Sequence, residues 1–372
     1  MHALVSGASM AGLSCAHWLY RAGYDITVVE RSPDLRQGGA PIDVRGEALG
    51  TAARMGILDR LHEFEITTHQ PMPVYGADGS VQASIDLTWF ANECPEDIEV
   101  SRDDLLTALS ESVDPAVALR FGTSITEIAE APYHVDVRLS SGEDAQVDLL
   151  VGADGLHSTV RRNAFGPEQQ YLHHLGFYVA LVNLDPDAGW ETGMYTVPGL
   201  TVSVRLDCGL PLAYVMFASE ALTIDYRDTA GQRRLVSDLL SEHPVWQIPG
   251  VRAGFEDPAS PGFYFDSIAQ TRMNRWSTAR TVLVGDAAHC ASLLSGLGST
   301  LAMTGAEQLA RALIRTTDIS AALVEYEAAQ RPLVTKAQHS ALANSTMMVP
   351  RTADEVSRRN AALKEMESAA RG

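Results

Sequence analysis

The hydrophobic pattern of the chain is most regular at three places, where a short apolar run is followed by a turn of small residues. The runs cover residues 2–6, 148–152 and 282–284. Continuous apolar runs of this length are typical of strands buried on both faces of a parallel sheet. An amphipathic stretch extends from the first run to Ala22, and after Gly23 a second strand is expected over Asp25–Val29. The pattern therefore predicts parallel βαβ units.

A different pattern separates these units. Apolar and polar residues alternate around residues 72–87 and again over about 175–217. Within residues 200–206 every second side chain is apolar, and the intervening ones are Thr201, Ser203 and Arg205. A period of two indicates an antiparallel sheet with one buried face.

Helical patterns dominate the last part of the chain. A helix is expected from about residue 301 to 314, with Ser299 as its N-cap. From residue 319 onward the chain is rich in Ala, Glu and Leu, which predicts terminal helices with breaks at Pro332 and Pro350. We expect these helices to pack on the βαβ units.

The turn after the first strand has the sequence Gly7-Ala-Ser-Met-Ala-Gly12, and Glu30 follows the second strand. Glycines at a strand-to-helix turn, with an acid about 20 residues further on, are typical of a dinucleotide-binding βαβ unit, in which the acid accepts the ribose hydroxyls. Ser9 replaces the middle glycine of this motif. A βαβ unit with a merely tight turn is the alternative.

The two other apolar runs also end in candidate binding residues. The second continues into Asp154-Gly155, with Ser158 and Arg161 behind it, and the third continues into Asp286 and the turn 295–299. Acids at the carboxyl ends of parallel strands face a ligand, and glycines let backbone N–H groups approach it closely. Taken singly, each segment also fits an ordinary strand and turn.

Together, these three motifs resemble those of the class A flavoprotein monooxygenases, the single-component FAD hydroxylases similar to para-hydroxybenzoate hydroxylase and to tetracycline-inactivating flavin monooxygenases. The match spans nearly the whole chain. Arg102 also fits, because it follows Ser101 at a predicted capping box where the family places an arginine against FAD. The resemblance implies FAD binding by Gly7, Ser9, Met10, Ala11, Gly12, Glu30, Arg31, Arg45, Arg102, Ile125, Asp154, Gly155, Gly285, Asp286, Gly296, Leu297, Gly298 and Ser299.

The implied fold class is α/β, with a glutathione-reductase-type, Rossmann-like FAD-binding domain, an antiparallel substrate sheet and C-terminal helices. We expect the FAD-binding domain to comprise residues 1–68, 98–168 and 272–318. The substrate domain would comprise residues 69–97 and 169–271, and residues 319–372 would form the helical segment. Aromatic and polar side chains of the sheet are candidates to line the substrate pocket: Tyr178, Trp190, Tyr195, Arg205, Tyr214 and Met216.

The resemblance implies a monooxygenase reaction. The sequence contains no second glycine-rich βαβ unit, so NADPH or NADH would bind transiently near Asp154 and Arg45 and reduce FAD. Oxygen would then give a flavin C4a-hydroperoxide that hydroxylates an electron-rich aromatic or polyketide-like molecule. The cofactor carries this chemistry, and the sequence identifies no catalytic side chain.

Other functions remain alternatives. Leu293, Leu297 and Thr300 stand where the family usually has proline, glutamine and asparagine. An FAD-dependent reductase or dehydrogenase without oxygen insertion is therefore the main alternative, and a non-catalytic FAD-binding protein is another. A flavin halogenase is disfavoured because no lysine precedes Lys336 and Pro244 replaces a motif tryptophan.

Composition narrows the class of partners. The chain has 372 residues, 46% of them hydrophobic, and a formal net charge of -19. This charge disfavours nucleic acids and anionic membranes, which bind basic surfaces. The four cysteines and eleven histidines show no metal-ligand spacing, and no apolar run is long enough to span a membrane. We expect a cytoplasmic monomer or homodimer without a metal.

Overall fold

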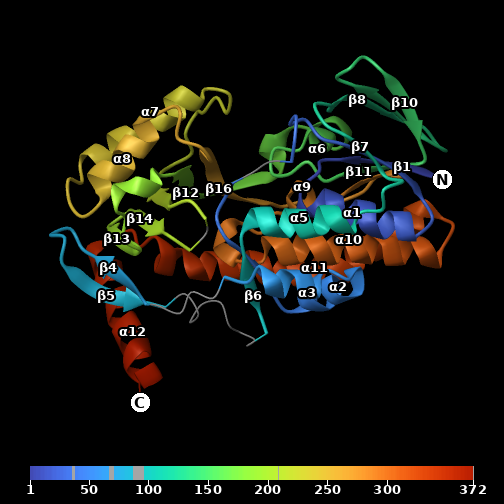
Figure 1. Ribbon diagram of the computed structural model, residues 1–372. Helices are drawn as coiled ribbons and strands as arrows, with labels where there is room; N and C mark the ends of the chain where they lie inside the picture. Colours follow the sequence, from blue (N-terminus) through green and yellow to red (C-terminus); the bar gives the residue numbers. More distant parts are fainter. Residues whose placement is uncertain (36–37, 67–70, 87–95, 208, 372) are drawn as a thin grey trace.

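The computed structural model describes residues 1–35, 38–66, 71–86, 96–207 and 209–371 (Figure 1). A parallel sheet of five strands forms the centre of one lobe. In spatial order its strands are β17 (Thr281–Leu283), β11 (Leu149–Gly152), β1 (His2–Ser6), β2 (Asp25–Val29) and β7 (Ala118–Arg120). The apolar runs of the sequence thus become neighbouring parallel strands, as predicted.

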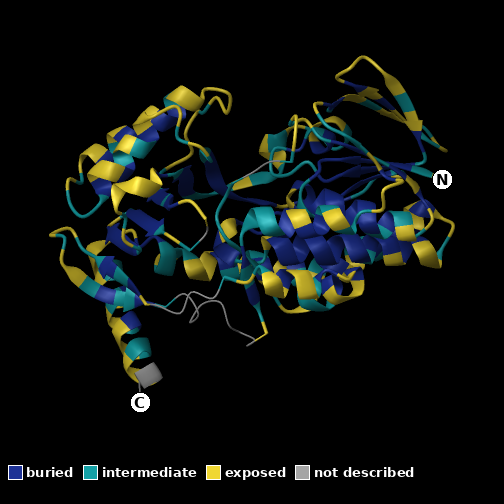
Figure 2. Cartoon of the chain, in the orientation of Figure 1, coloured by how far each residue is buried: buried dark blue, intermediate teal, exposed yellow. Residues whose placement is uncertain are grey.

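Helices and small sheets surround this parallel sheet. Helix α10 packs against both α1 and α11, and Figure 2 shows that it is buried along most of its length. The helices of this lobe are α1 (Met10–Arg21), α2 (Glu47–Met55), α3 (Leu58–Glu63), α5 (Arg102–Ser112), α6 (Thr159–Ala164), α9 (Asp286–His289), α10 (Gly298–Arg315) and α11 (Ile319–Met348), with the 3-10 turns η1 (Glu168–Gln170) and η3 (Leu293–Ser295). Its smaller sheets pair β3 (Ile42–Val44) with β6 (Ile98–Val100) and join β8 (Ile125–Glu130), β9 (Val135–Leu139) and β10 (Asp144–Val147).

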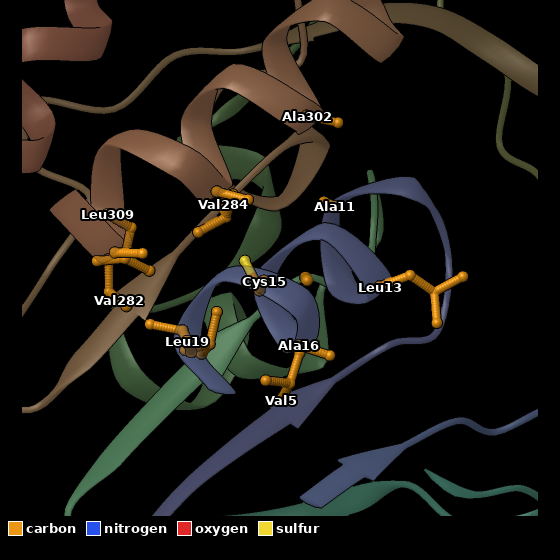
Figure 3. Packing of buried hydrophobic residues seen from close by; sticks show 14 of the residues in the cluster. Val5, Ala11, Leu13, Cys15, Ala16, Leu19, Val282, Val284, Ala302 and Leu309 are labelled. Atoms are coloured by element: carbon orange, nitrogen blue, oxygen red, sulfur yellow. The ribbon is translucent and has the colours of Figure 1, made fainter. Parts of the chain in front are cut away.

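One apolar cluster joins the sheet to α1 and α10. Figure 3 shows side chains of α1, including Cys15 and Leu19, gathered with Val5, Val282 and Leu309. All five are fully buried. Val5 lies on the central strand β1 and Val282 on the end strand β17, and the full burial of both explains why their segments read as continuous apolar runs. The cluster fixes the carboxyl ends of these strands relative to the start of α1.

A second lobe is built on a sheet of seven strands within the described residues. Its order is β16 (Tyr264–Thr271), β12 (Leu172–Asn183), β15 (Leu212–Ala218), β14 (Leu200–Arg205), β13 (Gly193–Val197), β4 (Met72–Tyr75) and β5 (Val81–Ile85). Neighbouring strands are antiparallel except β13 and β4, which are parallel. The turn η2 (Pro186–Ala188) and the helices α7 (Thr229–Ser241) and α8 (Ile248–Glu256) complete this lobe. The fold class predicted from the sequence is confirmed.

The expectation that one face of this sheet is exposed was wrong. One face is covered by α7 and α8, whose side chains pack on Val202 and Val204 of β14. The polar positions on the other face are also buried, with Thr201 at 0% and Ser203 at 7% exposure. Thr201 Oγ1 donates a hydrogen bond of 2.8 Å to the Met348 carbonyl at the end of α11. Small hydroxylated side chains therefore lie at an internal contact, because hydrogen bonding offsets the cost of burying them.

The C-terminal helices differ from the expectation in two ways. Pro332 does not interrupt the helix. Helix α11 continues through it and is held by buried residues on both sides, including Tyr326 and Val334. Pro350 does separate α11 from α12 (Ala353–Arg371). Helix α12 packs on the β-sheet of the second lobe, against β5 and β13, and places Leu363 beside Met72, Val74, Ala83, Ile85 and Met194. The C-terminal segment therefore contacts both lobes (Figure 1).

Candidate active site

The glycine turn presses the start of α1 against the end of β11. Gly7 has a φ of +105°, and a Cβ added there would lie 2.5 Å from the Ala153 carbonyl oxygen and 3.1 Å from Cα of Asp154. A Cβ at Gly12 would lie 1.8 Å from the Gly7 oxygen. Only glycine fits either position. The first and second motifs are thus brought together, with the amide groups at the start of α1 available to an anion.

Glu30 ends β2 and borders the same turn. Its Oε2 accepts a hydrogen bond of 2.9 Å from Ala8 N, and its Oε1 accepts one of 2.9 Å from Ser32 N. Arg31, by contrast, is exposed. Ile125 lies in the apolar core at 3% exposure, close to Thr123, whose N–H donates to the Glu30 carbonyl. Glu30 therefore lies where the sequence predicts, whereas the Ile125 side chain belongs to the core.

Arg102 joins the site from α5. Ser101 caps this helix by accepting a hydrogen bond from Asp104 N, so the predicted cap is confirmed. Arg102 Nη2 donates to Ser9 Oγ at 3.2 Å, across 93 positions of sequence. The Ser9 hydroxyl accepts no hydrogen bond from the amide groups of its own helix. A guanidinium and a helix N-terminus meet here, which is a combination suited to a phosphate group.

Asp154 lies in the loop before the short helix α6, whose N-cap is Ser158. Its carboxylate accepts hydrogen bonds from Thr159 N at 2.8 Å, Val160 N at 3.1 Å and Ser158 Oγ at 2.5 Å. Burial nevertheless raises the pKa of this carboxyl above its usual value. Gly155 has a φ of +80°, and a Cβ added there would meet no atom within 4 Å. Asp154 therefore organises its own loop, beside Gly7 and next to open space.

The segment after β17 is mostly buried, with three exposed positions and two partly exposed ones, Gly296 and Leu297. Asp286, Leu293 and Gly298 are exposed, whereas Ala287–Ser292 and Ser299–Thr300 are buried. Asp286 is reached by solvent, yet it lies so deep that the surrounding protein raises the pKa of its carboxyl. A Cβ added at Gly285 would lie 2.8 Å from Ala11 Cβ, so this segment packs on the start of α1. The three exposed positions form a strip on the solvent side of this segment, which is where the sequence predicts the flavin.

Ser299 does not cap α10, contrary to the prediction. The helix begins at Gly298, and the Ser299 hydroxyl donates to the carbonyl oxygen of Asp43. Thr300 Oγ1 lies 3.3 Å from both N and O of Arg45. The helix start at Gly298 leaves both hydroxyls directed at the strand segment 43–45 rather than at their own helix. Thr300, where the family usually has asparagine, thus joins two parts of the predicted flavin site.

Arg45 lies against the glycine turn of the same segment. It forms an ion pair of 2.7 Å with Asp43, and a Cβ added at Gly296 would lie 3.1 Å from Arg45 Nη1. Burial raises the pKa of the Asp43 carboxyl, partly countered by the Arg45 charge. The ion pair therefore lies at the edge of the cleft predicted to hold the flavin.

An apolar cluster connects this cleft to the sheet of the second lobe. It joins Leu294 and Ala40 to Val179, Leu181 and Met216 of the sheet. Tyr214 packs against it and is partly exposed, although the protein around it raises the pKa of its hydroxyl. This face of the sheet, which we call the cleft face, is defined by Val179, Leu181, Leu212, Tyr214, Met216, Tyr264 and Ile268.

Three predicted pocket residues lie on the opposite face. Tyr178 and Tyr195 pack among the side chains of α7 and α8, and Trp190 packs against the same cluster. The Tyr178 hydroxyl accepts from Leu222 N, and the Tyr195 hydroxyl lies 3.0 Å from His243 Nδ1. Successive side chains of a strand alternate between faces, so aromatic character alone did not identify the correct side. Arg205 points away from this core, because it pairs with Glu99 and Asp207.

The sequence analysis missed a group of polar residues at the boundary of the two lobes. His157 Nδ1 lies 3.0 Å from Glu168 Oε1, and its Nε2 lies 3.1 Å from Asp266 Oδ1. Burial lowers the pKa of His157, but the two carboxylates outweigh it and raise the pKa to about 9. The available sequence signal for Asp266 was a single acid within the strand segment 264–271, which has no other charged residue.

The convergence of these segments defines a class of protein. Glu30 and Arg102 contact the glycine turn, the segment that begins at Asp286 packs on the start of α1, and Leu294 joins this segment to the sheet of the second lobe. The residues present fit a dinucleotide whose second half is a flavin, because they combine an uncapped helix start, a guanidinium and glycine-lined space. The fold and the site are those of an FAD-binding oxidoreductase.

Comparison with known proteins identifies the family. The chain matches the FAD binding domain family over residues 1–187 and 265–341, and it belongs to that family. It is 32% identical to a flavin-dependent monooxygenase of Legionella longbeachae, over 89% of this chain and 85% of that protein. It is 38% identical to an uncharacterized protein of Mycobacterium tuberculosis, over 82% of this chain and 83% of that protein. The crystal structure of tetracycline destructase Tet(51) superimposes with a TM-score of 0.86 at 28% identity, covering 98% of this chain and 96% of that one.

The protein is therefore an enzyme, an FAD-dependent oxidoreductase of the monooxygenase type. When bound, FAD supplies the electron transfer and the activation of oxygen that side chains cannot provide. Among the described residues, no cluster of His, Cys, Asp and Glu is arranged to hold a metal ion. No helix in the described part of the chain is long and apolar enough to cross a membrane.

Proposed function

We propose that the enzyme uses NADPH or NADH to hydroxylate an electron-rich aromatic or polyketide-like molecule, with O2 as the second substrate. The observation that carries this proposal is the strip of Asp286, Leu293 and Gly298, which is exposed within a mostly buried segment, and whose neighbour Leu294 packs on the cleft face of the sheet. A flat flavin on one side and an apolar sheet on the other would enclose a ring-shaped substrate. Similarity to tetracycline destructases supports a substrate of several fused rings.

In this proposal the residues of the nucleotide lobe have distinct tasks. Arg102 and the start of α1 hold the pyrophosphate, Glu30 holds the ribose of the ADP half, and Asp286 binds the ribityl chain. The amides of residues 297–299 face the flavin ring. Asp154 and Arg45 border the entry of the nicotinamide donor. Leu294 and Met216 exclude water from the space between the lobes, and the absence of water prevents side reactions of reactive intermediates.

The proposed division of the chain follows the same scheme. Residues 1–68, 98–168 and 272–318 form the FAD-binding domain, residues 69–97 and 169–271 form the substrate domain, and residues 319–372 form the helical segment. The pairing of β4 and β5 with the large sheet supports the return of the chain to the second lobe between residues 69 and 97. We place the enzyme in the cytoplasm as a monomer or homodimer.

Isotope labelling tests the reaction. The FAD-loaded protein is incubated with NADPH or NADH, heavy oxygen gas and a panel of hydroxylated aromatic and polyketide compounds, with product mass as the readout. Incorporation of one labelled oxygen atom supports the proposal. Substrate conversion without label would instead support an FAD-dependent reductase, the alternative favoured by Leu293 at the cleft.

A further inference from the structure

A cavity of about 300 Å³ lies between α2 and α10, which pack side by side in the nucleotide lobe (Figure 1). Each helix contributes residues at intervals of three and four positions, which lie on one face of a helix. The lining residues are Gly46, Glu47, Gly50, Thr51 and Arg54 from α2 and its N-cap, and Thr304, Glu307, Gln308 and Arg311 from α10. Two polar helix faces therefore bound the cavity, and none of these residues is among those assigned to FAD.

Glu307 lies at the centre of this group and is 3% exposed. Its Oε1 accepts hydrogen bonds from Arg54 Nε and from Arg311 Nη2, both at 2.6 Å. Its Oε2 accepts from Thr51 Oγ1 at 2.6 Å and from Arg54 Nη2 at 2.7 Å. A carboxylate offers about four acceptor positions, so these four hydrogen bonds saturate Glu307.

The group formed by Arg54, Arg311 and Glu307 carries one surplus positive charge. Burial raises the pKa of the Glu307 carboxyl, but the hydrogen bonds from Arg54 and Thr51 and the charge of Arg311 outweigh burial and lower this pKa below its usual value. Glu307 is therefore ionised at neutral pH, and its single negative charge faces two guanidinium groups. The surplus contrasts with the net charge of -19 of the whole chain.

Several N–H groups of the two arginines are left without an acceptor. An arginine has five N–H donors, and in the described part of the chain neither Arg54 Nη1 nor Nε and Nη1 of Arg311 has a hydrogen-bond partner. The two side chains are 48% and 45% exposed, so a ligand can reach them. Gly50 leaves room for the first guanidinium, because a Cβ added there would lie 3.2 Å from Arg54 Nη1.

Glu47 is the other charged residue of the lining. It is exposed in the first turn of α2, and its charge contributes to the raised pKa of Arg54, after the hydrogen bond to Glu307 as the main cause. Seven positions separate Glu47 from Arg54, which corresponds to about two helical turns. The cavity thus has a cationic end at the two arginines and an acidic rim at Glu47.

We propose that this cavity binds a small organic phosphate, with the phosphate group on Arg54 and Arg311 and hydroxyl groups of the organic part on Glu47. Two guanidinium forks suit the several oxygens of a phosphate group. The acid at the rim accepts hydrogen bonds from hydroxyl groups and repels a second anionic group. Two sources supply this chemistry, namely the 2′-phosphate of NADPH and a free sugar phosphate.

The cavity lies next to the segment that borders the proposed entry of the nicotinamide donor. Gly46 and Glu47 directly follow Arg45 in the sequence. Thr304 lies one helical turn after Thr300, whose hydroxyl is 3.3 Å from N and O of Arg45. This neighbourhood is the reason for including NADPH among the two sources. For that source the inference rests on the proposed function, whereas a site for a free sugar phosphate is independent of it.

Isothermal titration calorimetry of the FAD-loaded protein tests the proposal. The probes are 2′-AMP and ribose 5-phosphate, compared with adenosine and ribose, which lack the phosphate. We expect the phosphates to bind at least about tenfold more tightly than the neutral compounds, because they gain charge-assisted hydrogen bonds. Tighter binding of 2′-AMP identifies NADPH as the source, and tighter binding of ribose 5-phosphate identifies a free sugar phosphate.

Two variants with opposite expected effects locate the site. Arg311→Gln should weaken phosphate binding about tenfold, because it removes the surplus charge while Arg54 still holds Glu307. Glu307→Gln should strengthen phosphate binding, because it leaves both arginines uncompensated, and misfolding does not produce a gain of affinity. Arg315→Gln is the matched control, since Arg315 ends the same helix and pairs with Glu325 outside the cavity.

A kinetic readout separates the two sources. If NADPH is the source, Arg311→Gln should raise the KM for NADPH and leave the KM for NADH unchanged. Equal phosphate binding by the unmodified protein and Arg311→Gln would overturn the proposal, as would a loss of affinity in Glu307→Gln protein that circular dichroism shows to be folded. Failure of this site leaves the proposed hydroxylation intact, because incorporation of labelled oxygen tests that reaction separately.

Discussion

Glu30 and Asp286 follow two strands of the parallel sheet, and their carboxylates face the cleft from opposite ends of the glycine turn. Glu30 already accepts two backbone hydrogen bonds, whereas Asp286 lies exposed in a deep position with a raised pKa. A carboxylate held in this way gains most from sugar or ribityl hydroxyl groups, which can donate to it.

We expect Glu30→Gln and Asp286→Asn each to weaken FAD binding about tenfold or more, because each removes a charge-assisted hydrogen bond worth about 1.5–3 kcal/mol. The visible absorbance of flavin per mole of protein, after passage through a desalting column, measures the effect. Asp25→Asn is the control, since Asp25 is exposed at the opposite end of β2. Equal flavin content in all three variants would contradict the assigned roles.

Leu293 is the residue at which the chain departs most visibly from its family. Its side chain is 41% exposed, at the first position of the turn η3. Ser292 before it has a ψ of 147°, which suits a residue preceding proline, and a φ of +82°, which is strained for serine with either residue at position 293. Proline is favoured at the first position of a helical turn.

Leu293→Pro should therefore be tolerated, with the free energy of unfolding unchanged or raised by up to about 1 kcal/mol. We further expect a larger fraction of the oxidised NADPH to yield hydroxylated product, since a rigid wall would exclude water better. Urea unfolding checks stability, and the ratio of product to NADPH consumed checks coupling. A fall in this ratio at unchanged stability would show that leucine is the better residue in this site.

Helix α11 contains a local conflict between sequence and structure. Pro332 is exposed within the helix and cannot donate a hydrogen bond to the carbonyl of Ala328 one turn earlier. The helix persists because its buried face packs on α10, where the Gln330 amide donates to the Leu301 carbonyl and to Thr304 Oγ1. Tertiary packing thus outweighs a local preference.

Pro332→Ala should raise the free energy of unfolding by about 1–3 kcal/mol, because it restores the backbone hydrogen bond and removes the steric clash. Chemical denaturation monitored by circular dichroism measures this. The matched control is Val324→Ala, which changes an exposed residue of the same helix. A gain no larger than that of the control would mean that the helix carries no strain at Pro332.

At the level of elements, the sequence predicted what a repeating pattern specifies. The apolar runs identified β1, β11 and β17, and the glycine turn identified the start of α1. Sequence periodicity could not predict which sheet face meets the cleft. Tyr178 and Met216 both fit the alternating pattern of a strand, and only the folded structure shows that they lie on opposite faces of the sheet. The partner of Asp266 was hidden for the same reason, since His157 lies 109 positions away.

In the whole molecule, His157 joins the two lobes, because its ring nitrogens lie within hydrogen-bond distance of Glu168 and Asp266. Its pKa is about 9 in the folded protein, compared with 6.5 for a free histidine side chain. Because the folded value is the higher one, the imidazolium contributes stability that is complete below pH 6.5 and is lost as pH rises through 9.

We therefore expect the free energy of unfolding to fall by up to about 3 kcal/mol over this interval, relative to His157→Asn at each pH. Urea denaturation at several pH values measures the difference between the two proteins. The difference should be constant below pH 6.5. A difference that does not change up to pH 9 would mean that the His157 contacts do not form in solution.

The position of α12 also has a consequence for the behaviour of the protein at high concentration. Strand β5 is the last strand of the large sheet in the described part of the chain, and its apolar side chains are covered by α12 through Leu363. An uncovered apolar sheet face beside an end strand favours association with other chains. A chain ending at residue 350 should therefore self-associate, visible as light scattering that grows with concentration, while Lys364→Ala on the exposed side of the helix remains dispersed. By covering this part of the sheet, helix α12 should therefore keep the folded protein from aggregating.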